Sequence, residues 1–313
     1  MIDRISTSAN QVLISIILPV YNCELYVTEA VKSILDQTET RFELIIIDDG
    51  STDKSLVLLK QFKDSRVVLI SRENRGLIET LNEGIKLSKG RLIARMDADD
   101  ISSPLRLEKQ LLFFNSNPNV ALCCLSLTKI DSNGVKIGEN TVSNTYFICK
   151  EELLFGNPIA HPTVMLNTAV IPKDKIYYDK KYIHAEDFEL WCRIIKEHKA
   201  VKIEQSLFKY RVHAKSVSSL NMKVQRESSV NAIKNNYLDS NRLANIENID
   251  NLFNHNQLML TYFATIIAML KIILASLSER KLSTLVILRL CARTMRVKIR
   301  KRNKASDIRS NLR

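Results

Sequence analysis

Short apolar runs alternate with amphipathic segments in the first hundred residues. The apolar runs have the length of β-strands and cover residues 14–18, 44–47, 67–70 and 92–96. Segments with apolar residues at helical spacing follow the first three runs, at 26–37, 56–62 and 77–87. Apolar strands that alternate with amphipathic helices are typical of a mostly parallel sheet covered by helices on both faces. The pattern therefore predicts an α/β fold.

A cluster of polar residues follows each of the four predicted strands. The clusters are residues 19–22, 48–49, 73–75 and 97–99. In open α/β sheets, ligands bind beyond the carboxyl ends of the strands, so four clusters on this rim predict a binding site there. The sequence has no Gly-x-Gly-x-x-Gly after the first strand and no Walker A motif, which argues against a Rossmann dinucleotide site and a P-loop.

Asp97 and Asp99 stand two residues apart after the fourth strand. If the backbone stays extended there, both side chains leave on the same side. Two such carboxylates repel each other unless a cation lies between them, and Mg²⁺ and Mn²⁺ bind carboxylate oxygens together with those of a phosphate. The spacing suits a metal–diphosphate site, although an isolated pair of this kind is more often a plain acidic loop.

The middle of the chain predicts a helix at 103–117 and a hairpin of residues 120–130 and 135–137 around a turn at 131–134. A second helix is expected to begin near Asp187, and a strand is expected at 208–213. Beyond about residue 220 the chain becomes polar, and an apolar segment at 258–277 is interrupted by Lys271. That lysine is costly in hydrocarbon, so we favour a packed or interfacial helix over a membrane span.

Composition and cysteine usage indicate a globular intracellular protein. The chain has 313 residues, which is enough for one large or two modest domains. Of these residues, 45% are hydrophobic and 26% are charged, as is typical of a globular protein. The six cysteines include no Cys-x-x-Cys pair, which favours reduced thiols over zinc ligands or a disulfide framework. The first ten residues contain no apolar core of a signal peptide, so we expect a cytosolic location.

The formal charge of +12 is concentrated at one end of the chain. Residues 278–313 hold twelve of the 46 basic and two of the 34 acidic residues, which leaves the rest of the chain nearly neutral. A basic tail after an apolar segment suits an anionic membrane surface, and we expect no specific nucleic-acid partner. A solvated tail that binds polyanions adventitiously is the alternative.

Seven short motifs together resemble the family 2 glycosyltransferases with the GT-A fold, in particular the bacterial members that build O-antigen, capsule and other polysaccharides. The motifs are residues 15–22, 46–53, 73–76, 94–100, 106–110, 186–187 and 210–213. They stand in the family's order and span roughly residues 14–218, which makes them far more specific than any one of them alone.

The resemblance implies a nucleotide-sugar donor, usually a UDP-sugar. By position, the donor-binding residues are Pro19, Tyr21, Asp49, Arg75 and Asp97. Pro19 and Tyr21 correspond to residues that border the base, and Asp49 to the acceptor of a hydrogen bond from the base edge. Arg75 matches a partner of the donor phosphate or base, although a solvated loop cation is an equally good reading of it.

The resemblance also implies Mn²⁺ or Mg²⁺ on the donor diphosphate and a catalytic base. Asp99, with Asp97 and His213, matches the metal ligands, and Asp187 matches the base that takes the acceptor's proton. One base without a second carboxylate nucleophile fits a single displacement with inversion. Asp187 as an ordinary charge at a helix start, and His213 as a structural histidine, are the alternatives.

These expectations define a domain plan and a cellular role. Residues 1–220 are expected to form the glycosyltransferase domain, with a donor-binding half at about 12–117 and an acceptor and catalytic half at about 118–220. Residues 221–313 are expected to be helical and basic. Members of this type usually act on a lipid-linked saccharide, so we expect a peripheral protein on the inner face of the cell membrane.

Two other classes remain open at this point. A sugar-nucleotide nucleotidyltransferase shares the α/β rim and the metal, but it typically has a glycine-rich basic loop after its first strand, where this chain has residues 19–23. A non-enzymatic protein that binds membranes or polyanions would account for the tail and leave the four rim clusters unexplained.

Overall fold

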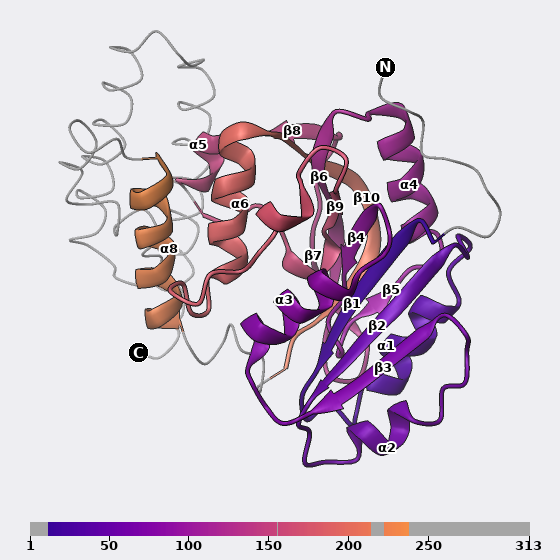
Figure 1. Ribbon diagram of the computed structural model, residues 1–313. Helices are drawn as coiled ribbons and strands as arrows, with labels where there is room; N and C mark the ends of the chain where they lie inside the picture. Colours follow the sequence, from indigo (N-terminus) through magenta and orange to yellow (C-terminus); the bar gives the residue numbers. More distant parts are fainter. Residues whose placement is uncertain (1–11, 155, 214–221, 238–313) are drawn as a thin grey trace, which may run out of the picture.

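The computed structural model describes residues 12–154, 156–213 and 222–237. Its first part alternates strands and helices in the predicted order (Figure 1). These elements are β1 (Ile14–Val20), α1 (Val27–Leu35), β2 (Phe42–Asp49), α2 (Ser55–Leu59), β3 (Val67–Arg72), α3 (Leu77–Leu87) and β4 (Leu92–Arg95). β1 pairs in parallel with β2 and with β4, and β2 pairs in parallel with β3. Every residue of β2 is buried, which is why its centre is a continuous apolar run.

The second part extends the same sheet with shorter elements. They are β5 (Ile101–Ser102), α4 (Arg106–Ser116), β6 (Val120–Ile130), β7 (Lys136–Asn140), β8 (Tyr146–Ile148), α5 (Lys150–Leu153), the 3₁₀ turn η1 (His161–Thr163), β9 (Met165–Asn167), the 3₁₀ turn η2 (Lys173–Lys175), α6 (Glu186–Glu197), β10 (Lys199–Arg211) and α8 (Met222–Tyr237). The strand order is β3-β2-β1-β4-β9-β6-β10-β5, with β7 beside β6 and β8 beside β10.

Strand directions differ between the two parts of the sheet. β6 and β10 are parallel, whereas β9, β7, β8 and β5 run antiparallel to their neighbours. The antiparallel pairing of β6 with β7 confirms the predicted hairpin. The predicted strand at 208–213 is the end of a longer strand that begins at Lys199. The sequence pattern did not predict the earlier part of that strand, because the polar residues from Glu204 to Ser206 interrupt the apolar pattern.

Helices cover both faces of the sheet, as predicted (Figure 1). α1, α2 and α4 pack in one core cluster, and α3, α6 and α8 pack in the other. Neighbouring residues of β1 divide between them, because successive side chains of a strand point to opposite faces: Ile16 and Leu18 belong to the first cluster and Ile17 to the second. The sheet therefore holds the carboxyl ends of its strands on a rigid support.

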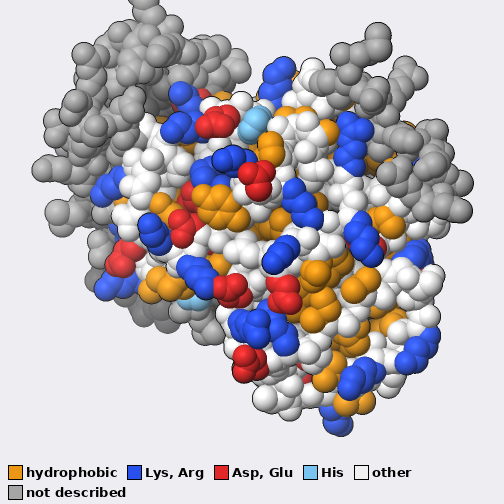
Figure 2. Space-filling model, viewed as in Figure 1, with side chains coloured by type: hydrophobic (Ala, Val, Ile, Leu, Met, Phe, Trp, Pro, Cys, Tyr) orange, Lys and Arg blue, Asp and Glu red, His pale blue; other side chains and the backbone are white. Residues whose placement is uncertain are grey.

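The surface of the described part agrees with a nearly neutral body. On the face seen in Figure 2, Lys and Arg side chains are spread among Asp and Glu side chains instead of forming one patch. Among the described helices, none has the length and apolar character needed to cross a bilayer. The apolar segment at 258–277 and the basic tail at 278–313 lie outside the described residues.

Candidate active site

Two cavities meet beyond the carboxyl ends of β1 to β4. The larger cavity has a volume of about 870 Å³ and is lined from all four predicted clusters, by Pro19, Tyr21, Asp49, Asn74, Asp97 and Asp99 among others. The smaller cavity, of about 350 Å³, is lined by residues that include His161, Glu186, Asp187 and Tyr210. Leu77, Asp97 and Asp99 line both cavities. The two spaces are therefore adjacent, and the acidic residues lie at their junction.

The loops that follow β1 and β2 are joined by hydrogen bonds at the mouth of the larger cavity. The side-chain oxygen of Asn22, a residue with a φ of 50°, accepts the backbone N–H of Thr52 at 2.8 Å. In return, the Asp53 carboxylate accepts the backbone N–H of Glu24 at 3.0 Å. These bonds fix the backbone next to Tyr21, a residue that is 54% exposed and lines the larger cavity.

Asp49 organises the loop that follows β3. Its carboxylate accepts the backbone N–H groups of Arg75 at 2.8 Å and Gly76 at 3.0 Å, and it forms an ion pair with Arg72. The side chain of Arg75 is 54% exposed and pairs with Glu73. Among the described residues, Gly76 lines the larger cavity and Arg75 does not. A donor role for the Arg75 side chain stays a prediction.

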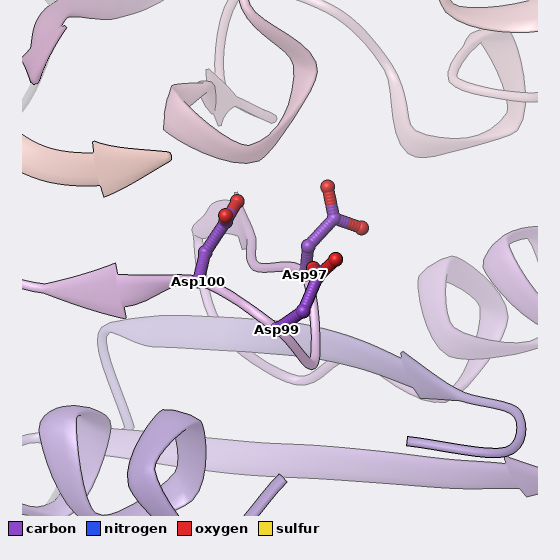
Figure 3. Close-up of side chains that lie close together, drawn as sticks. All are labelled: Asp97, Asp99 and Asp100. Carbon is purple, nitrogen blue, oxygen red and sulfur yellow. The ribbon is translucent and has the colours of Figure 1, made fainter. Parts of the chain in front are cut away.

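Asp97, Asp99 and Asp100 form a compact cluster, which we call the acidic turn (residues 97–100). Each offers one carboxylate oxygen within 4.8 Å of the other two, and the three side chains rise from the same side of the turn (Figure 3). The extended backbone assumed from the sequence is wrong here, because β4 ends at Arg95 and residues 98 and 99 form a turn. The turn, and not the strand pleat, brings the carboxylates together.

The acidic turn fits a divalent cation. Burial, followed by repulsion from Asp97, raises the pKa of Asp99. Burial, followed by repulsion from Asp97 and Asp99, raises the pKa of Asp100 well above its usual value. One carboxylate oxygen of Asp100 is buried without a hydrogen-bond partner among the described residues. Closely spaced carboxylates of this kind are costly on their own and are stabilised by a hard cation with oxygen ligands. Sequence reasoning missed Asp100, whose only signal is its place in the acidic run.

His213 lies beside Asp99, although 114 positions separate them in the chain. Its Nε2 atom is 2.8 Å from an Asp99 carboxylate oxygen, and its ring lies 5.5 Å from that of Tyr26. The structure thus places this histidine at the acidic turn, where a metal ligand is predicted. Its role as a ligand stays a prediction.

Asp187 is the second residue of α6 and lines the smaller cavity. The side-chain amide of Asn157 donates to one of its carboxylate oxygens at 3.2 Å. Burial, and then the neighbouring charge of Glu186, raise the pKa of Asp187 to about 7. A carboxylate with a pKa near neutrality is suited to accept a proton from a hydroxyl group, because it is ionised in part and still basic.

Arg95 is a buried charge that the sequence reasoning passed over. Its side chain is 7% exposed and forms an ion pair with Asp97, and it lines the smaller cavity. Beyond it, His161 and Tyr178 share a hydrogen bond of 2.7 Å, and burial lowers the pKa of His161 well below its usual value. The available signal was a single basic residue within an apolar strand, which must be neutralised by a partner when it is buried.

The sequence model described as glycosyl transferase family 2 matches residues 15–171, half of the chain. The chain belongs to glycosyl transferase family 2. The O-antigen biosynthesis glycosyltransferase WbnJ of Escherichia coli is 37% identical to it over 212 residues, 65% of this chain and 81% of WbnJ. An uncharacterized glycosyltransferase of Haemophilus influenzae is 33% identical over 69% of this chain and 71% of that protein. The UDP-Glc:alpha-D-GlcNAc-diphosphoundecaprenol beta-1,3-glucosyltransferase WfgD of Escherichia coli is 28% identical over 66% of this chain and 80% of WfgD.

Solved structures share the fold of this family 2 glycosyltransferase. Residues 1–349 of S. aureus TarS in complex with UDP-GlcNAc superpose with a TM-score of 0.60 at 19% identity, covering 77% of this chain and 70% of that one. The mannosyltransferase PcManGT from Pyrobaculum calidifontis, in complex with GDP-Man and Mn²⁺, gives 0.58 at 15% identity over 94% and 88% of the two chains. The predicted family, GT-A fold and enzyme class are confirmed.

Proposed function

We propose that this glycosyltransferase moves a sugar from a UDP-sugar to a saccharide acceptor by a metal-dependent reaction that inverts the anomeric centre. The observation that carries the proposal is the shared lining of the two cavities by Asp97 and Asp99. A donor in the larger cavity would hold its diphosphate at the acidic turn, and an acceptor in the smaller cavity would meet Asp187 there. The reacting groups are then brought together at the junction.

The larger cavity supplies the groups that a nucleotide needs. Pro19 and Tyr21 offer an apolar and aromatic wall for the base. Asp49 lies in the same lining, and the oxygen that accepts from Gly76 retains acceptor capacity for a donor on the base edge. A bound divalent cation would neutralise the charge that develops on the leaving diphosphate, and Asp97, Asp99 and His213 are the residues that would hold it.

The smaller cavity supplies the base. In the proposed step, an acceptor hydroxyl oxygen forms a bond to the anomeric carbon, the bond from that carbon to the phosphate oxygen breaks, and the nucleoside diphosphate leaves with the electron pair. The hydroxyl proton passes to Asp187, whose second carboxylate oxygen is held by Asn157. Attack from the side opposite the leaving group inverts the configuration.

The acceptor proposal rests on the relatives and on the charge of the chain. WbnJ is named for O-antigen biosynthesis, and the name of WfgD gives a diphosphoundecaprenol-linked acceptor. We therefore propose a lipid-linked acceptor, a role in cell-surface polysaccharide biosynthesis and a peripheral position on the inner face of the membrane, with residues 278–313 meeting anionic lipid. The donor half at 12–117, the acceptor half at 118–220 and the basic region at 221–313 remain part of this proposal.

A donor panel tests the proposed reaction. The protein is incubated with Mn²⁺ and a set of UDP- and GDP-sugars, and the release of nucleoside diphosphate is measured. We expect UDP from one of the UDP-sugars and loss of that release in Asp99→Ala, because the substitution removes a metal ligand from a surface rim. Asp36→Asn, an exposed acid at the end of α1, is the matched control and should retain the release.

Three outcomes would contradict parts of the proposal. Full turnover by Asp99→Ala with the metal chelated would contradict the proposed metal site. GDP release from a GDP-sugar would show that the donor carries guanine and not uracil. Exchange of inorganic diphosphate in place of nucleoside diphosphate release would indicate a nucleotidyltransferase.

A further inference from the structure

Arg211, the last residue of β10, has the richest set of polar contacts around the acidic turn. Its guanidinium donates from Nε to the backbone oxygen of Asp99 at 2.7 Å and from Nη2 to the Glu29 carboxylate at 2.6 Å. Nη1 donates to the backbone oxygens of Asp131 and Ser132, each at 3.2 Å. Only 2% of the side chain is exposed.

The backbone and the ring contacts of Arg211 act on the same turn. Its backbone N–H donates to a carboxylate oxygen of Asp100 at 2.7 Å. The guanidinium carbon lies 4.5 Å from the centre of the Tyr26 ring, and that ring faces His213. The residue therefore joins the acidic turn to the start of α1 and to the turn between β6 and β7, segments far apart in the sequence.

We infer that Arg211 is a positioning residue that holds the acidic turn in the shape that binds the cation and the donor diphosphate. The inference rests on the proposed function, because it takes the acidic turn to be the metal site. Arg211 touches the backbone of Asp99 and leaves the Asp99 carboxylate to His213. It therefore acts on the orientation of the ligands and not on the reacting atoms.

A lysine cannot replace this arginine. Four of the five guanidinium N–H groups are used, and they point in different directions within one plane to reach three separate segments. A lysine ammonium keeps the charge but has three donors on a single atom. Arg211→Lys should therefore keep the local charge and lose the bonds that orient the turn.

The test compares Arg211→Lys with Arg66→Lys, a control with similar contacts at the opposite edge of the sheet. Arg66 is paired with Asp64, donates to the backbone oxygen of Leu35 and lies 4.5 Å from the centre of the Phe42 ring. Mn²⁺ binding is measured by EPR titration in the presence of UDP, and UDP binding by calorimetry without metal. Thermal unfolding is recorded for both variants.

We expect Arg211→Lys to weaken Mn²⁺ binding by roughly 10- to 100-fold, the range seen when partners that orient metal ligands are lost. UDP binding without metal should change less than about twofold, because Arg211 is not among the described residues that line the larger cavity. A change of this size is typical of a substitution outside a binding site. Arg66→Lys should match the wild type in both measurements.

The outcomes separate this inference from the proposed function. Wild-type protein that binds no Mn²⁺ with UDP would contradict the metal site itself. Wild-type protein that binds Mn²⁺, together with an Arg211→Lys variant of equal affinity, would overturn only the role of Arg211. If Arg211→Lys unfolds at the temperature of the assay, Glu29→Ala takes its place. This substitution removes the exposed acceptor of one guanidinium N–H and should weaken Mn²⁺ binding in the same direction.

Discussion

The environment of Asp187 bears on both the stability of the folded protein and the chemistry proposed for this residue. Burial, and then the charge of Glu186, raise the pKa of its carboxyl to about 7. Because this value lies above that of the unfolded chain, ionisation of Asp187 destabilises the folded state as the pH rises toward 7. The same environment keeps the carboxylate basic enough to take a proton from a hydroxyl group.

Asp187→Asn keeps the shape of the side chain and removes its basicity. We expect kcat to fall by roughly 10²-fold or more with little change in donor affinity. The melting temperature at pH 8 should be no lower than that of the wild type, because the costly buried charge is gone. Asp174→Asn, an exposed acid in η2, is the control. An equal loss of donor binding would place Asp187 in the donor site instead.

The pH profile gives a second readout of the same carboxylate. In the wild type, kcat/KM should fall as the pH drops below about 7, since the protonated carboxyl cannot accept a proton. Glu186→Gln removes the neighbouring negative charge, so the pKa of Asp187 should decrease and the acid limb should move to lower pH. A limb that stays in place would show that another group controls it.

At the scale of elements, the loop after β2 and the loop after β3 approach each other closely at Gly50. Gly50 follows β2 with a φ of +72°, a region that residues with a Cβ rarely adopt. A Cβ atom on Gly50 would lie 2.6 Å from the backbone nitrogen of Asn74, which lines the larger cavity. The glycine therefore lets the loop after β3 close against the loop after β2, with Asp49 bonded to its amides.

Gly50→Ala should displace the loop that contains Asn74 and weaken donor binding. Left-handed backbone with a Cβ costs about 1–2 kcal/mol, and the close contact adds to that cost. We expect a raised KM for the donor and a lower melting temperature. Gly138→Ala in β7, where a Cβ would meet nothing within 4 Å, should leave both unchanged. Equal behaviour of the two variants would show that the loop does not depend on Gly50.

For the whole molecule, the distribution of charge separates the catalytic body from the end of the chain. The face of the described body in Figure 2 carries side chains of both signs, while residues 278–313 hold twelve basic and two acidic residues after an apolar segment. Apolar side chains and clustered bases together suit the boundary of an anionic bilayer. Such an attachment would bring the smaller cavity to a lipid-linked acceptor.

Truncation after Ser278 should release the protein from vesicles that contain anionic lipid, while hydrolysis of the donor remains. The measurement is vesicle sedimentation at low and high salt, because added salt screens the attraction of the bases. Removal of residues 1–11, which carry one acid and one base, is the control and should not alter sedimentation. If the full-length protein does not sediment with such vesicles at low salt, the membrane role is contradicted.

The alternation of β1 to β4 with their helices, and the place of the polar clusters, follow from the order of residues along the chain. In a parallel sheet the carboxyl ends of the strands share one rim, so the position of a cluster in the sequence is enough to locate it. For this reason the sequence alone predicts that Tyr21, Asp49, Asn74 and Asp97 line one cavity.

Which distant segments meet that rim depends on the tertiary structure. The end of β10 and the residues after it place Arg211 and His213 at the acidic turn, more than a hundred residues away in the chain. α6 places Asp187 in the lining of the smaller cavity, which Asp97 and Asp99 also line. Local periodicity encodes the type of each element but not the strand order β4-β9-β6-β10, which depends on how the crossovers pack. The raised pKa of Asp187 could not be predicted from the sequence either, because it follows from burial in the packed structure.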